Sequence, residues 1–418
     1  MTDDQKSQLI GTFQLNRDEP VHSWYNYLAG YSSEFVKSYV REFGIQKNQL
    51  VFEPFAGSGT TLVACKELGI PSFGVEINPF LLFVTRTKLY WDFDIEKLGE
   101  KANKLLSSVD SLTLSRDEIE DCPYFIHKAF SRDILEKILK IQKAICLEDN
   151  QKERDFFLLG LISILRQVSN YKNWAPYPEP RKKPVVDVNV KVHLHKNIKK
   201  MIKDLESIQK QKSSSAMAEV IMHDARHLEK LLNVSFKNRK ADFVLTSPPY
   251  LNNWDYGWIT RIELFFTGFA TTQREITSTV RNKLVKSSTY VLQNVDKEIQ
   301  PLFSNGPARD KIEELQRIIG EKQARRKNPK KYTMVLTAYF NDMYMVLKGL
   351  YALMQPSASC CIVIGDSGMY ATHVPTDVLL YDLGEQVGFE KKELRILRKR
   401  RATRHALDLR ESVIVLQR

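Results

Sequence analysis

Short apolar runs that each end at a polar residue recur along this chain. Runs of this length are typical of strands buried in a parallel sheet. Four of them are Leu50 to Glu53, Ser72 to Glu76, Val220 to Asp224 and Ala241 to Thr246. The carboxyl ends of parallel strands share one edge, and open α/β folds bind their ligands at that edge. We therefore expect Glu53, Glu76, Asp224 and the loop after Thr246 to lie close together.

The apolar pattern becomes helical between residues 93 and 215. Within it, Ile134, Ile138 and Ile141 recur near the helical period. This spacing predicts a helical insert between the second and third strands. Lys210 to Ser215 has the composition of a solvated linker that returns the chain to the sheet. Ahead of the first strand, residues 22–43 predict one further helix.

The first strand leads into a loop that carries two glycines, Glu53-Pro54-Phe55-Ala56-Gly57-Ser58-Gly59-Thr60-Thr61. Gly57 and Gly59 let the backbone turn sharply and approach a ligand. A helix that begins near Thr60 presents free N–H groups to a carboxylate or phosphate. The Gly-x-Gly spacing alone serves nucleotides, flavins and S-adenosylmethionine alike.

Three further side chains suit a ligand that contains a nucleoside. Glu76 follows the glycines by about twenty residues, at the place where a carboxylate accepts hydrogen bonds from ribose hydroxyls. Phe55 stands two residues before Gly57, so we expect it to contact the ligand in preference to packing only under the sheet. Asp224 has two interpretations, since it can accept a hydrogen bond from an adenine amino group or cap a helix before His227.

The fourth strand leads into a loop of unusual stiffness, Thr246-Ser247-Pro248-Pro249-Tyr250. Two consecutive prolines fix φ and remove two N–H donors, so the loop offers carbonyl oxygens. The Pro248 carbonyl and the Ser247 hydroxyl are acceptors for an exocyclic amino group, and Tyr250 supplies a flat ring for stacking. The loop therefore predicts a site for a nucleobase.

The charge of the chain is consistent with a polyanionic partner. Its 418 residues carry a formal net charge of +12. Basic residues crowd the segments from Lys391 to Arg404 and from Lys322 to Lys331. We expect these two clusters to contact a phosphate backbone, with an affinity that falls as salt rises.

Several other classes of protein are disfavoured. The five cysteines show no Cys-x-x-Cys spacing, so we expect no metal site. Cys360 and Cys361 stand in an apolar run that predicts a buried strand. The first residues are polar and no apolar run reaches the roughly 18 residues of a membrane span. We therefore expect a cytoplasmic protein with no membrane partner.

Both loops resemble those of the S-adenosylmethionine-dependent DNA methyltransferases that modify exocyclic amino groups, at cytosine N4 or adenine N6. The resemblance also includes Tyr250 to Tyr256, Ile362 to Ser367 and Arg410 to Leu416. It implies an α/β, Rossmann-like class I methyltransferase fold, whose mostly parallel seven-stranded sheet is interrupted by the helical insert. Members with Ser before the two prolines are mostly cytosine-N4 enzymes, so Ser247 favours cytosine.

The resemblance also implies roles for individual residues. S-adenosyl-L-methionine is the implied cofactor, and the residues implied to bind it are Glu53, Phe55, Ala56, Gly57, Gly59, Thr60, Glu76 and Asp224. The residues implied to be catalytic are Ser247, Pro248, Pro249 and Tyr250. Double-stranded DNA is the implied substrate, and a cognate restriction endonuclease is an implied partner. Such an enzyme acts on the nucleoid of a bacterial or archaeal cell.

The chain then divides into three parts. Residues 1–92 hold the N-terminal helix and the cofactor-binding part of the core, residues 93–215 the helical insert, and residues 216–418 the catalytic part. A basic insert at about 270–332 interrupts the last part. Either insert is a candidate for reading the DNA sequence. Adenine-N6 methylation, RNA base methylation and an inactive nucleic-acid-binding subunit remain alternatives.

Overall fold

The fold is that of a computed structural model, which describes residues 11–172, 177–210, 216–233, 239–292, 299–401 and 407–418. Its centre is a seven-stranded sheet with the strand order β3-β2-β1-β4-β5-β9-β8. Its strands are β1 (Val51–Glu53), β2 (Ser72–Glu76), β3 (Ala218–Met222), β4 (Ala241–Thr246), β5 (Met354–Gly365), β8 (Glu390–Arg401) and β9 (Asp408–Gln417). Only β9 runs against its neighbours. The prediction of a mostly parallel, seven-stranded sheet is confirmed.

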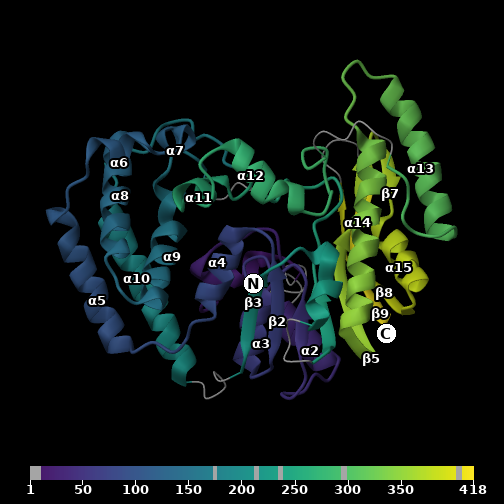
Figure 1. Cartoon of the computed structure of the whole chain (residues 1–418), viewed down its shortest axis with the longest axis horizontal. Coiled ribbons are helices and arrows are strands. Elements are labelled where there is room, and N and C mark those ends of the chain that lie inside the picture. The colour runs from purple at the N-terminus through teal and green to yellow at the C-terminus, as the bar shows by residue number, and fades with distance from the viewer. Residues whose placement is uncertain (1–10, 173–176, 211–215, 234–238, 293–298, 402–406) are drawn as a thin grey trace.

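Helices cover both faces of this sheet (Figure 1). On one face, α2 (Ser33–Glu42) and α3 (Thr60–Leu68) pack buried side chains such as Phe35 and Cys65 against Phe243 and Cys361. On the other face lie the short helix η4 (Ala225–Asn233), α14 (Tyr332–Leu353) and α15 (Thr376–Val387). Cys360 and Cys361 are fully buried in β5, which confirms the strand predicted there.

The helices between β2 and β3 form the predicted insert. They are α5 (Ile95–Ser108), α6 (Arg116–Glu120), α7 (Tyr124–Ala129), α8 (Arg132–Cys146), α9 (Gln151–Val168) and α10 (Val190–Lys210), and α4 (Pro79–Lys88) precedes them. The linker predicted after Lys210 lies outside the described residues. In Figure 1 the insert forms one end of the molecule, and α13 (Pro307–Ala324) lies at the opposite end.

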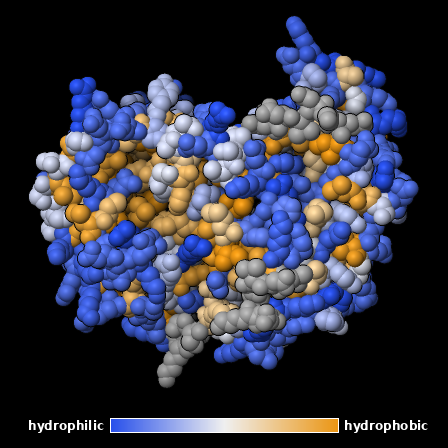
Figure 2. All heavy atoms as spheres, viewed as in Figure 1, coloured by the Kyte–Doolittle hydropathy of each residue, from blue (hydrophilic) through white to orange (hydrophobic). Residues whose placement is uncertain are grey.

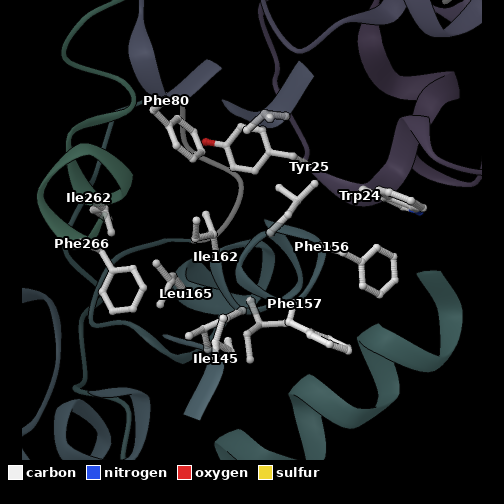
Figure 3. Close-up of a cluster of buried hydrophobic side chains, with 14 of the residues drawn as sticks. Trp24, Tyr25, Phe80, Ile145, Phe156, Phe157, Ile162, Leu165, Ile262 and Phe266 are labelled. Atoms are coloured by element: carbon white, nitrogen blue, oxygen red, sulfur yellow. The ribbon is translucent and has the colours of Figure 1, made fainter. Parts of the chain in front are cut away.

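The insert is packed firmly onto the rest of the chain. Figure 3 shows Phe156, Phe157 and Leu165 of α9 in one apolar cluster with Trp24 and Phe266. The last of these belongs to α11 (Arg261–Phe266), which α12 (Gln273–Thr279) follows. The Arg166 side chain also donates from Nε to Glu263 Oε1 over 2.8 Å. Because one continuous core joins these elements, the insert has a fixed orientation relative to the sheet.

Figure 2 shows hydrophilic residues over most of the visible outer surface and hydrophobic residues towards its centre. Within the described part of the chain, no helix combines the length and the apolarity that a membrane crossing requires.

The segment ahead of β1 differs from its prediction. The expected helix over residues 22–43 is wrong for its first half, because α2 begins only at Ser33. The Ser32 side chain accepts a hydrogen bond from the Phe35 backbone N–H and so starts the helix there. Residues 22–24 form one short 3-10 turn, and residues 25–32 form a loop. This leaves a stretch of non-helical backbone near the carboxyl edge of the sheet.

Candidate active site

The carboxyl edge of the sheet brings together the polar residues predicted there. Glu53 ends β1, Glu76 ends β2, Thr246 ends β4, and Asp224 follows β3 by two residues. Parallel pairing of β1 with both β2 and β4 places these ends at the same edge. The Gly57 N–H donates to Glu76 Oε2 over 2.8 Å, which ties the glycine loop to the second strand.

Glu53 is a buried connector between these elements. Its Oε2 accepts hydrogen bonds from the Tyr31 hydroxyl at 2.6 Å and the Thr61 hydroxyl at 2.9 Å. Its Oε1 accepts from the Phe55 backbone N–H at 2.9 Å and from the Thr246 hydroxyl. Burial raises the pKa of this carboxyl to about 7, although each of these donors lowers it. Glu53 therefore holds the glycine loop, α3 and β4 together beneath the site.

Glu76 has capacity left to bind a ligand. Its two oxygens accept from the backbone N–H groups of Gly57 and Asn78, each at 2.8 Å. A carboxylate oxygen can accept more than one hydrogen bond, so hydroxyl donors can still reach both oxygens. Burial raises the pKa of Glu76 to about 7, although the backbone N–H groups of Asn78, Gly57 and Ile77 lower it.

The glycine loop has the backbone that its sequence predicts. Gly57 and Gly59 adopt φ values of +53° and +85°, in the left-handed region that favours glycine. A Cβ atom on Gly59 would lie 2.8 Å from Thr85 Cγ2, so the loop also packs too closely there for a side chain. α3 begins at Thr60 directly after these turns, as predicted. Ala56 and Thr60 line the cavity next to this helix.

Asp224 caps a helix, which is one of its two predicted interpretations. Its Oδ1 accepts from the Arg226 backbone N–H at 2.9 Å, at the start of η4, as a helix cap does. The Arg226 guanidinium contacts the same carboxylate, with Nη2 at 2.6 Å from Oδ2, and lowers its pKa below the usual range despite burial. Asp224 nevertheless lines the same cavity as Glu76.

The proline loop follows β4 and is held at its tyrosine. The Tyr250 hydroxyl donates to Glu411 Oε1 on β9 over 2.9 Å and lies 3.4 Å from Ser247 Oγ. The Tyr250 backbone N–H donates to the Tyr256 hydroxyl over 3.2 Å. A Cβ atom on Gly365 would lie 2.9 Å from Tyr250 Cδ2, so the ring rests directly on the backbone at the end of β5.

Three cavities meet at Ser247. The first, of about 630 Å³, is lined by Glu76, Asp224, Phe55 and Pro249. The second, of about 320 Å³, lies over Glu53 and the start of α3. The third, of about 750 Å³, is lined by Pro248 and Tyr250. Ser247 borders all three, so a ligand held over the first two strands and a base in the third cavity would meet at this residue.

Residues that the sequence did not single out complete these walls. Ala29 borders all three cavities and Tyr27 borders two, both from the loop ahead of α2. Residues 283–285 close the first cavity from within the predicted basic insert. Arg398 and Arg400, which belong to the predicted basic segment, form part of the third together with Glu411. The aromatic residues Trp24, Tyr25 and Tyr27 stand close together in the sequence and could have indicated a wall of the site. No local pattern marks Ala29 or residues 283–285.

The basic segment near the C-terminus is the edge strand β8. Part of its charge is neutralised, because Arg395 pairs with Glu42 at 2.7 Å and Arg398 pairs with Glu411 at 2.5 Å. Lys399, Arg400 and Arg401 instead line an open cavity of about 940 Å³. This cavity lies next to the third cavity, because Arg400 borders both. Arg404 lies outside the described residues.

The described residues contain no group of three or more His, Cys, Asp or Glu side chains that could hold a metal ion. Every described cysteine is free, and Cys65, Cys360 and Cys361 are buried. Burial raises the pKa of the Cys65 thiol far above its usual range.

Comparisons with known proteins support one family. A family model described as a DNA methylase matches residues 26–85. The chain is 25% identical over 448 aligned residues to the Type II methyltransferase M.BsoBI of Geobacillus stearothermophilus, and the match covers 93% of this chain and 82% of the relative. It is 23% identical to the Type II methyltransferase M.AvaI of a Nostoc species, covering 94% of this chain and 83% of the relative.

An rRNA methyltransferase, aviRa from Streptomyces viridochromogenes, aligns with 10% sequence identity and a TM-score of 0.33, covering 100% of this chain and 94% of the other.

Proposed function

We propose that this protein methylates the N4 amino group of cytosine in duplex DNA. The chain belongs to the DNA amino-methyltransferases, whose methyl donor is S-adenosylmethionine, and we infer the reaction from this family. The position of Ser247 carries this proposal. It precedes the two prolines, as in the cytosine-N4 enzymes that the loop resembles, and it borders all three cavities. Adenine N6 is the alternative acceptor.

The first two cavities have the chemistry that S-adenosylmethionine requires. In the first, the Glu76 carboxylate is available to ribose hydroxyls, while Phe55, Ile77 and Leu81 supply apolar walls for a purine. In the second, Ala56, Gly57 and Thr60 surround the start of α3, where free N–H groups favour a carboxylate. Asp224 keeps an acceptor near the purine. Glu53 and Gly59 are both buried, and Glu53 also lines the second cavity.

The proposed mechanism begins with a base rotated out of the duplex, which costs a few kcal/mol of lost stacking and pairing. Tyr250 replaces part of that stacking in the third cavity. Ser247 Oγ and the Pro248 carbonyl accept hydrogen bonds from the amino group, which removes its lone pair from conjugation with the ring and aims it at the second cavity. S-adenosylmethionine supplies an electrophilic methyl group there. Transfer would leave S-adenosylhomocysteine and a cationic nitrogen that releases its proton to water, so the residues act by positioning more than by acid-base chemistry.

The DNA must be held around this site by other elements. We propose that Lys399 and Arg401 contact phosphates, because they line the open cavity beside the base site. The helical insert and the segment around α13 stand on opposite sides of the carboxyl edge in Figure 1, so we propose that both contribute to target recognition. We further propose a role in restriction and modification, with a cognate endonuclease as partner.

The test is expression in a bacterial host that lacks DNA methylation. Nucleoside mass spectrometry of DNA and RNA, together with single-molecule sequencing of the genome, should find N4-methylcytosine at one recurring short site. The Ser247→Ala variant serves as the matched control. N6-methyladenine would overturn the choice of base, and methylated RNA beside unmodified DNA would overturn the choice of nucleic acid.

A further inference from the structure

The wall of the third cavity that faces the proline loop is built from β8 and β9. Arg398 and Arg400 come from β8, and Glu411 comes from β9. Residues 398 and 400 lie two apart on a strand, so their side chains share one face. This face places two guanidinium groups beside a cavity whose other wall carries the acceptors Ser247 and Pro248.

Arg398 is already committed within the protein. Its Nε donates to Glu411 Oε2 over 2.5 Å, and Glu411 Oε1 accepts from the Tyr250 hydroxyl over 2.9 Å. Glu411 is 4% exposed, so this carboxylate has little contact with water. Arg398 therefore balances the charge that orients Tyr250, and most of its function is structural.

Arg400 has N–H groups at the edge of the Tyr250 ring that are available to bind a ligand. Its Nη2 donates to the Asp366 carbonyl over 2.9 Å, the one hydrogen bond to a described residue that it makes. A guanidinium carries five N–H groups, so most remain available. A Cβ atom on Gly365 would lie 3.1 Å from Arg400 Nη2 and 2.9 Å from Tyr250 Cδ2, which places both groups against the same point of the backbone. A base stacked on Tyr250 would thus present its edge to Arg400.

We propose that Arg400 selects cytosine by donating two hydrogen bonds to N3 and O2 of the rotated base. In cytosine these acceptors lie side by side, next to the amino group that Ser247 and Pro248 hold, and a planar guanidinium matches such a pair. Adenine offers N1 next to its amino group and then a C–H, so the same fork would find one acceptor and leave one donor unpaired. Unpaired polar groups are what make such discrimination strong.

This inference rests on the proposed cytosine-N4 activity and adds its specificity residue. The test uses duplexes that carry the site found by sequencing, with either cytosine or 3-deazacytosine as the target. The analogue keeps the amino group and O2 but replaces N3 by C–H. Single-turnover methyl transfer is measured for the wild type, Arg400→Gln, Arg400→Lys and Arg401→Gln.

The wild type should transfer methyl groups about 10- to 100-fold more slowly to the analogue, which is the discrimination that a paired base contact provides. Arg400→Gln should lose about that factor on cytosine and show little further loss on the analogue. Arg400→Lys should behave in the same way, since it keeps the charge and loses the fork. Arg401→Gln removes a neighbouring charge outside the third cavity, so it should keep the full discrimination.

Other results would overturn the assignment. If Arg400→Gln discriminates against the analogue as the wild type does, or if Arg400→Lys matches the wild type, Arg400 contacts a phosphate instead of the base. Cofactor binding by calorimetry confirms that each variant is folded. N6-methyladenine as the product would remove the proposed function itself, whereas N4-methylcytosine with unchanged discrimination would remove only this role of Arg400.

Discussion

Substitution of Gly365 by Ala tests whether the position of Tyr250 controls base capture. The added Cβ would lie 2.9 Å and 3.0 Å from Cδ2 and Cε2 of the Tyr250 ring. Carbon atoms at optimal contact are about 3.5–4.0 Å apart, so the ring must move by several tenths of an ångström or more. The Tyr250 hydroxyl is fixed by Glu411, and the ring therefore cannot shift as a whole without losing that hydrogen bond.

The expected cost can be worked from these contacts. Stacking of one base on an aromatic side chain is worth about 1–3 kcal/mol, which corresponds to roughly 5- to 150-fold. We expect Gly365→Ala to lower kcat/KM for DNA by about 10- to 100-fold, within that range. Crowding in a packed region also destabilises the fold by about 1–3 kcal/mol. Affinity for S-adenosylmethionine should not change, because Gly365 does not border the first two cavities.

Three measurements on one preparation decide this prediction: single-turnover methyl transfer, calorimetry with S-adenosylmethionine and thermal unfolding. Gly320→Ala in α13 is the matched control, because the Cβ there would lie 3.7 Å from its nearest neighbour, Thr333 Cγ2 of α14. That variant should be active and up to about 1 kcal/mol more stable. Activity of Gly365→Ala within twofold of the wild type, measured well below the Tm of the variant, would show that the position of the Tyr250 ring does not control base capture.

Three further predictions follow from the same structure. Because burial raises the pKa of Glu76 to about 7 and hydroxyl donors bind its ionised form more strongly than its protonated form, affinity for S-adenosylmethionine should be up to about tenfold weaker at pH 6 than at pH 8, and a flat profile in calorimetry would contradict this. Ser247→Ala should chiefly lower the single-turnover rate and Tyr250→Ala should chiefly weaken base capture; equal activity of both with the wild type would eliminate the mechanism. Burial lowers the pKa of Lys88 from 10.5 to about 7, so between those values the unfolded chain binds a proton that the folded chain lacks, and the free energy of unfolding should rise with pH. Lys88→Met should lose that part of the rise in denaturant titrations at pH 7.5 and 9.

The strand ends were predictable because a buried parallel strand is a local pattern. Glu53, Glu76 and Thr246 each end an apolar run, and the structure places all three at strand ends on one edge. The backbone of the glycine loop was equally predictable, since glycine adopts a positive φ easily and both Gly57 and Gly59 do so. The length of the helix ahead of β1 was predicted wrongly, although Gly30 and the Ser32 cap mark the place where α2 begins.

The wall of the third cavity that β8 and β9 form could not be predicted from local sequence. Arg400 and Glu411 stand in segments that look only basic or apolar in sequence, and they reach Tyr250 because β8 and β9 form an antiparallel pair at the far side of β5. Asp224 likewise forms a bidentate contact with Arg226, and neither of its predicted interpretations included this contact.

The buried strands and the turns of the glycine loop are predictable from local sequence, because strand burial and backbone turns depend on residues close together in the chain. The ligand that each loop suits stays a prediction. Tertiary packing, in contrast, sets that Ser247 borders three cavities, that Ala29 and residues 283–285 line them, and that Arg400 lies beside Tyr250. These contacts join residues up to several hundred positions apart, and packing of the whole chain, with no local signal, sets their distances.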